Sequence, residues 1–274
     1  MTLDLARELE LAVTLARRAG ALILGLHATG LAVDRKAGDE PVTQADRDAN
    51  TLIVSELSLA FPDDGLLSEE APDDGTRLTR DRVWMVDPLD GTKDFIRGSD
   101  GFATMIGLIV GERPALGVVY QPIGDRLYFA TAGTGSFLQV GRGAPARLKV
   151  SDVEDLSQIR MVASKSHRDQ VIDEVRRELG ISDELNVGSV GLKLGLIARG
   201  DRDLYVNPSG HSKLWDTCGP EIILVEAGGR LTDSDGHLLS YRAAEIRNLN
   251  GLIASNGHLH DEVVRRLTPL LSRR

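Results

Sequence analysis

One stretch organises this chain: Arg82-Val83-Trp84-Met85-Val86-Asp87-Pro88-Leu89-Asp90-Gly91-Thr92-Lys93-Asp94-Phe95. The apolar run 83–86 is rich in β-forming residues and has polar neighbours, which predicts a buried strand. Because proline fixes φ and does not extend a central strand, we expect the chain to turn as Asp87 and Asp90 arrive. Gly91 and Thr92 then predict a tight bend into a helix start, where backbone N–H groups attract phosphate. Two hard oxygen ligands beside such a turn suit Mg²⁺ and a phosphoryl group together.

The two acids, Asp87 and Asp90, have other interpretations. A solvated turn is the usual role of an Asp-Gly pair. An EF-hand calcium loop needs an acid at its third position and a glutamate at its twelfth, where this chain has Leu89 and Gly98. Phosphatases of the haloacid dehalogenase type carry a similar motif with an aspartyl nucleophile, but with acids two residues apart. Here Asp87 and Asp90 lie three apart, which favours two metal ligands.

Length and composition bound the remaining possibilities. The 274 residues are 42% hydrophobic, enough for one large domain or two smaller ones packed tightly together. A net charge of −9 argues against a nucleic-acid polymer as partner. A single cysteine, Cys218, is typical of a reducing compartment. The N-terminus has no basic and apolar leader, and no run approaches the roughly 20 apolar residues of a membrane helix. We therefore expect a cytoplasmic protein that does not enter membranes.

The hydrophobic patterns predict alternating elements. Helices are expected over 3–27, 44–60, 169–179, 189–199, 214–227 and 258–271. Strands are expected over 102–110, 115–120, 126–131 and 135–140, as an antiparallel meander, and over 160–164, 203–206 and 251–255. Near residue 150 the expected pattern changes from consecutive short strands to alternating strands and helices. We therefore expect an N-terminal α+β subdomain, 1–150, and a C-terminal α/β subdomain, 151–274.

Three further acids each have an ordinary structural explanation when taken alone. Asp46 falls in the first turn of the helix 44–60, where an acid complements the helix dipole. Thr43 or Gln44 is expected to cap that helix. Glu69 ends a short apolar segment, and Asp216 lies at the start of a helix that glycines close. Structural salt bridges become an improbable explanation when Glu69, Asp87, Asp90 and Asp216 are considered together.

Together these motifs resemble the inositol monophosphatase superfamily. Asp87-Pro88-Leu89-Asp90-Gly91-Thr92 and Trp215-Asp216 look like its two signature motifs, and Glu69-Glu70 and 42–46 match in order and spacing. The resemblance covers about residues 36–257. It implies a layered αβαβα sandwich of the sugar-phosphatase type in two packed subdomains, with most metal ligands in the N-terminal subdomain, 1–150, and substrate-binding residues in the C-terminal one, 151–274. It also implies a Mg²⁺-dependent, lithium-sensitive phosphatase acting on a small phosphorylated substrate.

Within that superfamily, 213–221 looks most similar to the 3′(2′),5′-bisphosphate nucleotidases. Those enzymes remove the 3′-phosphate of adenosine 3′,5′-bisphosphate, a by-product of sulfur metabolism. Segments 164–167 and 188–189, together with Lys193, fit the nucleotide-binding segments of that branch. Plain inositol monophosphatase is the alternative, and a metal-binding nucleotide sensor without turnover is an alternative of another class. A homodimer is left open beside a monomer.

The resemblance also assigns roles to individual residues. Glu69, Asp87 and the carbonyl of Leu89 would hold one Mg²⁺, and Asp87, Asp90 and Asp216 a second, with two or three ions in all. Asp46 and Thr92 would form the pair that takes a proton from the attacking water. The expected substrate-binding residues are Gly91, Thr92, Ser164, His167, Ser189, Lys193 and Asp216. Asp94 is expected to be a surface or helix-turn acid, and His258 and His260 are not expected to bind zinc.

Overall fold

The computed structural model describes residues 3–29, 33–35, 41–165 and 170–271. Its helices are α1 (Ala6–Thr29), α2 (Gln44–Ala60), α3 (Thr92–Ile96), α4 (Gln170–Leu179), α5 (Val190–Ala198), α6 (Leu214–Glu226) and α7 (His260–Leu271), with short 3₁₀ turns η1 (Thr76–Thr79) and η2 (Leu156–Gln158). Its strands are β1 (Val33–Arg35), β2 (Pro41–Thr43), β3 (Gly65–Ser68), β4 (Arg82–Asp90), β5 (Ala103–Val110), β6 (Arg113–Gln121), β7 (Arg126–Thr131), β8 (Gly135–Val140), β9 (Ala146–Arg147), β10 (Arg160–Ser164), β11 (Asp183–Val187), β12 (Leu204–Asn207), β13 (Arg230–Thr232) and β14 (Leu252–Ser255).

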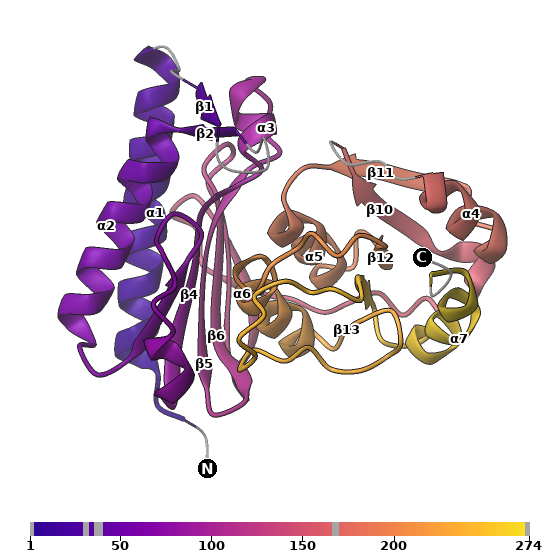
Figure 1. Cartoon of the computed structure of the whole chain (residues 1–274). Coiled ribbons are helices and arrows are strands. Elements are labelled where there is room, and N and C mark those ends of the chain that lie inside the picture. Colours follow the sequence, from indigo (N-terminus) through magenta and orange to yellow (C-terminus); the bar gives the residue numbers. More distant parts are fainter. Residues whose placement is uncertain (1–2, 30–32, 36–40, 166–169, 272–274) are drawn as a thin grey trace.

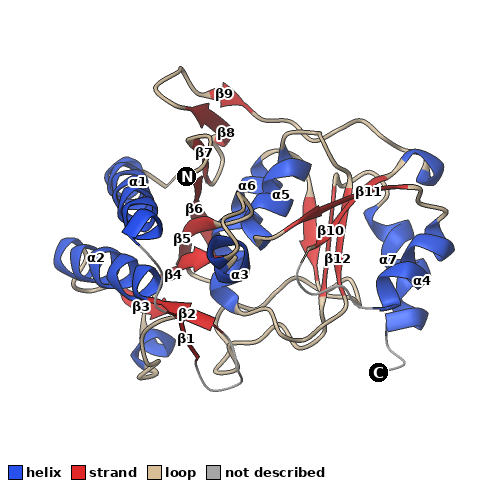
Figure 2. Cartoon of the chain, turned by 90° about the horizontal axis from the view of Figure 1, so that it is seen from above, coloured by secondary structure: helices blue, strands red, loops and turns tan. Residues whose placement is uncertain are grey.

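The layers of the molecule alternate helix, sheet, helix, sheet, helix (Figure 1). Helices α1 and α2 cover one face of a sheet ordered β3-β4-β5-β6-β7-β8-β9, and α5 and α6 lie on its other face. A second sheet, ordered β11-β10-β12-β14-β13, follows, and α4 and α7 cover its outer face. Figure 2 shows the same succession from above. The predicted αβαβα sandwich is confirmed.

Strand β4 belongs to two cores at once, because successive side chains of a strand point to opposite faces. Trp84 and Val86 pack with the apolar faces of α1 and α2. Val83 and Met85 pack on the other side, in the core that contains residues of α5 and α6. Burial on both faces explains why the run 83–86 is continuously apolar rather than alternating.

The predicted turn at Pro88 is wrong, because β4 continues to Asp90. Strand β3 pairs with β4 only as far as Val86. Along β5, Asp87 lies opposite Met105 and Asp90 opposite Ala103, so β4 has one extra residue at this point and forms a bulge. Proline is tolerated at a bulge because no ladder hydrogen bond needs its missing N–H. The extra residue also brings two acids that are three apart in sequence to the same side of the sheet.

The other predicted elements are largely confirmed. The meander is antiparallel from β5 to β8, with boundaries that differ by one or two residues from those expected. In the second sheet, β10 is parallel to β11 and to β12. Strands β1, β2, β3, β9, β11 and β13 were not predicted as such.

Helix α6 lies directly against the first sheet although it comes late in the sequence. A Cβ atom on Gly117 of β6 would lie 2.1 Å from the carbonyl oxygen of Gly219. One on Gly107 of β5 would lie 2.6 Å from the Gly219 nitrogen. The backbones therefore touch only because these positions lack side chains. Because of this contact, the N-terminal end of α6, which contains Asp216, lies near the end of β4.

Candidate active site

The predicted site acids come from separate elements that meet at the end of β4. Asp87 and Asp90 lie on β4, Glu69 directly follows β3, and its N–H donates to the Val86 carbonyl at 3.1 Å. Asp216 lies in the first turn of α6. The structure thus gathers acids that span about 150 positions of the sequence.

Electrostatics show that these carboxylates act on one another. Burial, followed by the carboxylates of Glu69 and Asp90, raises the pKa of Asp87 well above its usual value. Burial, then Asp90 and Glu69, does the same to the pKa of Asp216. Like charges gathered out of water disfavour the ionised form of each group. The set is therefore poised to accept positive charge.

Two lysines supply part of that positive charge. Lys193 of α5 is buried, and its Nζ donates to the carbonyl oxygens of Gly188 and, at 2.9 Å, of Ser189. Burial lowers the pKa of Lys193 to about 8, while the nearby Asp90 and Asp94 carboxylates act to raise it. Lys213 acts to lower the pKa of Asp216, as a nearby cation does for a carboxylate. These two ammonium groups offset only part of the negative charge of the four site acids.

The site acids fit a divalent cation by their chemistry. Their donor atoms are all oxygens, the ligand type that Mg²⁺ prefers. Their spacing is wider than that of a single compact cluster. Within the described ranges, the set of three acids or histidines whose ligand atoms all lie within 4.8 Å of one another is Asp233, Asp235 and His237, on a loop where two of the three are exposed.

Asp90 receives its hydrogen bonds from the start of α5. Ser189 Oγ donates to Asp90 Oδ2 at 2.5 Å, and the Gly191 N–H donates to the same oxygen at 3.3 Å. Burial raises the pKa of Asp90, whereas Lys193 and these donors act to lower it. Ser189, expected to bind substrate, thus contacts an expected metal ligand.

Thr92 and Asp46, the pair that the resemblance implies, lie within hydrogen-bond distance of each other. Thr92 Oγ1 donates to Asp46 Oδ1 at 3.1 Å and lies equally close to the Leu89 carbonyl oxygen. The other oxygen of Asp46 accepts from the N–H and the hydroxyl of Thr43, at 2.7 and 2.6 Å. Burial raises the pKa of Asp46, and the hydrogen bonds from Thr43 act to lower it.

Gly91 makes the tight bend between β4 and α3. Its φ is 96°, a left-handed conformation that glycine adopts without strain. A Cβ here would lie 2.5 Å from the Gly101 carbonyl oxygen. The Leu89 N–H donates to Asp87 Oδ1 at 3.0 Å, so the loop between the two acids is held by the first of them.

The remaining predicted substrate residues have different outcomes. Ser164 ends β10 and is partly buried. His167 lies outside the described residues. The prediction that Asp94 is a surface or helix-turn acid is wrong as regards the surface, because its side chain is 1% exposed. Lys193 is buried as well, and its contact with a substrate stays a prediction.

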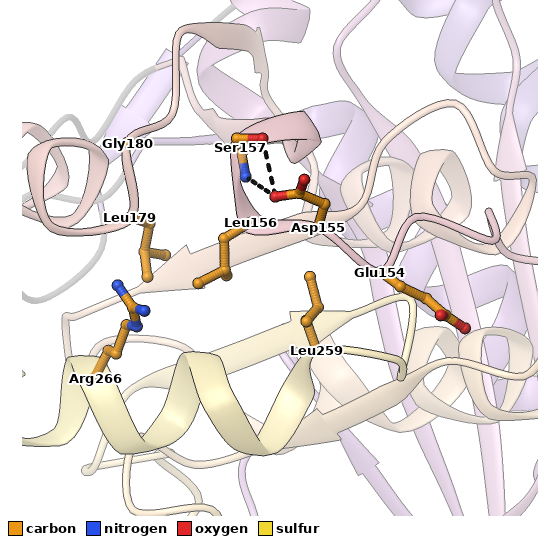
Figure 3. A pocket seen from close by; sticks show the side chains of 8 residues that line it. All are labelled: Glu154, Asp155, Leu156, Ser157, Leu179, Gly180, Leu259 and Arg266. Atoms are coloured by element: carbon orange, nitrogen blue, oxygen red, sulfur yellow. Dashed lines mark hydrogen bonds between the residues drawn. The ribbon is translucent and has the colours of Figure 1, made fainter.

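A surface hollow and a buried histidine lie outside this site and share no residues with it. A hollow of about 630 Å³ lies between η2, the end of α4 and α7, and Figure 3 shows Leu156 and Leu259 facing it, with Arg266 beside them. His260 is buried, and its ring nitrogens lie 2.9 and 2.8 Å from the hydroxyl oxygens of Thr232 and Ser255. Of the helices in the described ranges, none is long and apolar enough to cross a membrane.

Comparison with known proteins agrees with this geometry. The inositol monophosphatase family model matches residues 4–270. The 3′(2′),5′-bisphosphate nucleotidase CysQ of Salmonella typhimurium is 37% identical over 86% of this chain and 95% of its own. The histidinol-phosphatase of Mycobacterium tuberculosis is 35% identical over 95% and 97%. The structure of an IMPase from Thermotoga maritima superposes with a TM-score of 0.82 at 27% identity, covering 97% and 98% of the two chains.

Proposed function

The chain belongs to the inositol monophosphatase family and is a phosphatase of that family, and on this premise we propose that it removes the 3′-phosphate of adenosine 3′,5′-bisphosphate. The observation that supports phosphoester hydrolysis best is the Thr92–Asp46 hydrogen bond of 3.1 Å beside the four carboxylates. A hydroxyl and a buried acid so arranged can receive a proton from water next to a cation site.

Mg²⁺ is the cation that these residues fit. Glu69, Asp87 and the Leu89 carbonyl, with Asp90 and Asp216, are the oxygen donors that would hold it. Bound there, the metal would activate water and neutralise charge on the phosphoryl oxygens. Loss of Mg²⁺ should therefore abolish turnover, and we expect Li⁺ to inhibit it.

The protein groups supply the proton path and the phosphate cradle. Asp46, held by Thr43, keeps an oxygen aimed at Thr92, so that the threonine hydroxyl proton is drawn to Asp46 and a lone pair is left for the proton of the attacking water. The N–H groups of Gly91 and Thr92 at the bend are the donors for phosphate oxygens.

The substrate assignment rests on CysQ similarity, and other relatives have other substrates in their names. A panel of adenosine 3′,5′-bisphosphate, inositol 1-phosphate and histidinol phosphate, assayed by phosphate release with Mg²⁺, tests it directly. We expect the highest kcat/KM for the nucleotide. A higher kcat/KM for inositol 1-phosphate would transfer the assignment to inositol monophosphatase, the alternative. Absence of release from all three would leave the metal-binding sensor.

A further inference from the structure

Asp94 has no role in the chemistry described above, yet it is one of the most buried acids of the chain, at 1% exposure. It lies on α3, two residues after Thr92. Ser99 Oγ donates to its Oδ1 at 2.6 Å, and Lys165 Nζ lies 3.2 Å from the same oxygen. A buried carboxylate with such partners is held in one orientation, unlike a solvated side chain.

The backbone that follows β11 packs directly on this carboxylate. A Cβ on Gly188 would lie 2.3 Å from Asp94 Oδ2 and 2.2 Å from the Gly101 carbonyl oxygen. The same Gly101 oxygen accepts a hydrogen bond from the Ser189 N–H at 2.9 Å. Gly188 is therefore clamped between Asp94 and the segment that leads into β5, and the position has no room for a side chain.

The clamped segment in turn holds Asp90. Ser189 Oγ donates to Asp90 Oδ2 at 2.5 Å, and Lys193 Nζ donates to the Ser189 carbonyl at 2.9 Å. A continuous set of contacts thus leads from Asp94 through Gly188 and Ser189 to Asp90. It crosses between the sheet that carries β4 and the start of α5.

We propose that Asp94 is a positioning residue: it fixes the backbone at Gly188–Ser189, and through Ser189 it fixes the direction of the Asp90 carboxylate. The inference rests on the proposed function in so far as Asp90 is a Mg²⁺ ligand. Groups that orient a metal ligand change metal affinity or activity by about 10–100-fold when removed. An ordinary buried acid has no such effect on a metal site elsewhere in the molecule.

A double-mutant cycle tests this coupling. Mg²⁺ affinity of the full chain is measured by calorimetric titration for Asp94→Ala, Ser189→Ala and the double variant, with kcat and KM measured beside it. We expect each single change to weaken Mg²⁺ binding about 10–100-fold, and the double change to be hardly worse than the stronger single one. If the loss of Mg²⁺ affinity in the double variant equals the product of the two single losses, Asp94 and Ser189 act independently and the inference is overturned.

Two controls separate positioning from stability and from charge. Asp203→Ala removes another acid of 1% exposure, paired with Arg160 in the second sheet, and should lower the melting temperature without changing Mg²⁺ affinity. Lys165→Met removes the ion pair of Asp94 but keeps the carboxylate against Gly188. If Lys165→Met reproduces the whole effect of Asp94→Ala, the ion pair carries the effect and the inference is wrong.

If Asp94→Ala does not fold, Asp94→Asn takes its place, because the amide keeps the shape that packs on Gly188. We expect Asp94→Asn to weaken Mg²⁺ binding less than 10–100-fold, and its effect not to multiply with that of Ser189→Ala. Unchanged Mg²⁺ affinity in Asp94→Asn, or a double variant whose loss equals the product of the two single losses, would contradict the inference. Coupling with no phosphate release from any substrate would overturn the proposed function alone. Phosphate release without coupling would overturn the inference alone.

Discussion

Helices α2 and α6 begin alike, although they cover opposite faces of the first sheet. In each, an aspartate at the third helical position accepts a hydrogen bond from the N–H of the residue before the helix. Asp46 Oδ2 accepts from Thr43 at 2.7 Å, and Asp216 Oδ2 accepts from Lys213 at 2.8 Å. Each cap satisfies a backbone donor that the helix leaves unpaired.

The difference between them is the neighbour of each acid. The second oxygen of Asp46 faces the Thr92 hydroxyl, whereas the charge of Asp216 faces Asp90 and Glu69. A cap fixes a carboxylate in direction, and its surroundings then decide whether it handles a proton or a metal ion. Under the proposed function, the same capping arrangement would thus serve two kinds of chemistry.

The largest effect should come from Asp216→Asn. The amide still accepts the Lys213 N–H, so α6 keeps its cap, but one negative charge is lost from the metal site. Because charge stabilisation by a bound metal is worth several kcal/mol, we expect turnover to fall by about 10⁴-fold or more. Mg²⁺ affinity, measured by calorimetry, should fall as well. Unchanged affinity would remove Asp216 from the metal site.

Asp46→Asn should distinguish the role of the acid at the start of α2 from the role of Asp216 at the start of α6. The loss of a proton acceptor predicts a fall in kcat of about 10²–10⁴-fold. Mg²⁺ affinity should stay as in the unmodified protein, because Asp46 is assigned to the proton and not to the metal. A parallel fall of Mg²⁺ affinity in both variants would mean that the two acids share one role.

A third helix start, that of α7, extends the comparison to a group that affects stability and not turnover. Burial lowers the pKa of His260 to about 4, so the folded protein keeps this imidazole neutral between Thr232 and Ser255. The unfolded chain binds the proton at higher pH, near 6.5, so stability is lost as pH falls from about 6.5 to 4. The full loss is about 3 kcal/mol. Denaturant unfolding across this window should show it, and His260→Gln should remove that part of the pH dependence.

The smallest effect concerns the cap of α2 itself. Thr43→Ala removes the hydroxyl that accepts the Ala45 N–H at 3.2 Å and donates to Asp46. Such a loss lowers the free energy of unfolding by about 1 kcal/mol. Thr43→Ser keeps the hydroxyl and should restore most of the stability in denaturant unfolding. An equal loss in both variants would place the effect in the methyl group.

Local patterns were sufficient for the elements that carry the site. The cap Thr43, the helix that follows it and the acids of β4 are signalled within a few residues of sequence. The continuation of β4 through Pro88 was missed because it depends on where β3 ends and on a bulge against β5. Strand β11 was missed because its residues are mostly exposed and give no apolar alternation.

The environment of individual side chains was harder to predict. Asp94 was predicted to be a surface or helix-turn acid, and it does lie in the first turn of α3. Its burial was missed because the groups that enclose it, Lys165 and Gly188, lie more than 70 positions away in sequence. The burial of Lys193 was not predicted, because it depends on how α5 packs between two sheets. The proton pair was predicted by resemblance, and no spacing rule within the chain links Asp46 to Thr92.

The glycine contact between α6 and the first sheet has a consequence for biosynthesis. Domains of a growing chain fold as units and N-terminal parts first. When the strands of the first sheet have left the ribosome, the helix that packs on Gly107 and Gly117 has not yet been made. Asp216 arrives only with α6, about a hundred residues later. A nascent chain therefore carries Asp87 and Asp90 before Asp216 has been made, and the set of four acids is complete only late in synthesis.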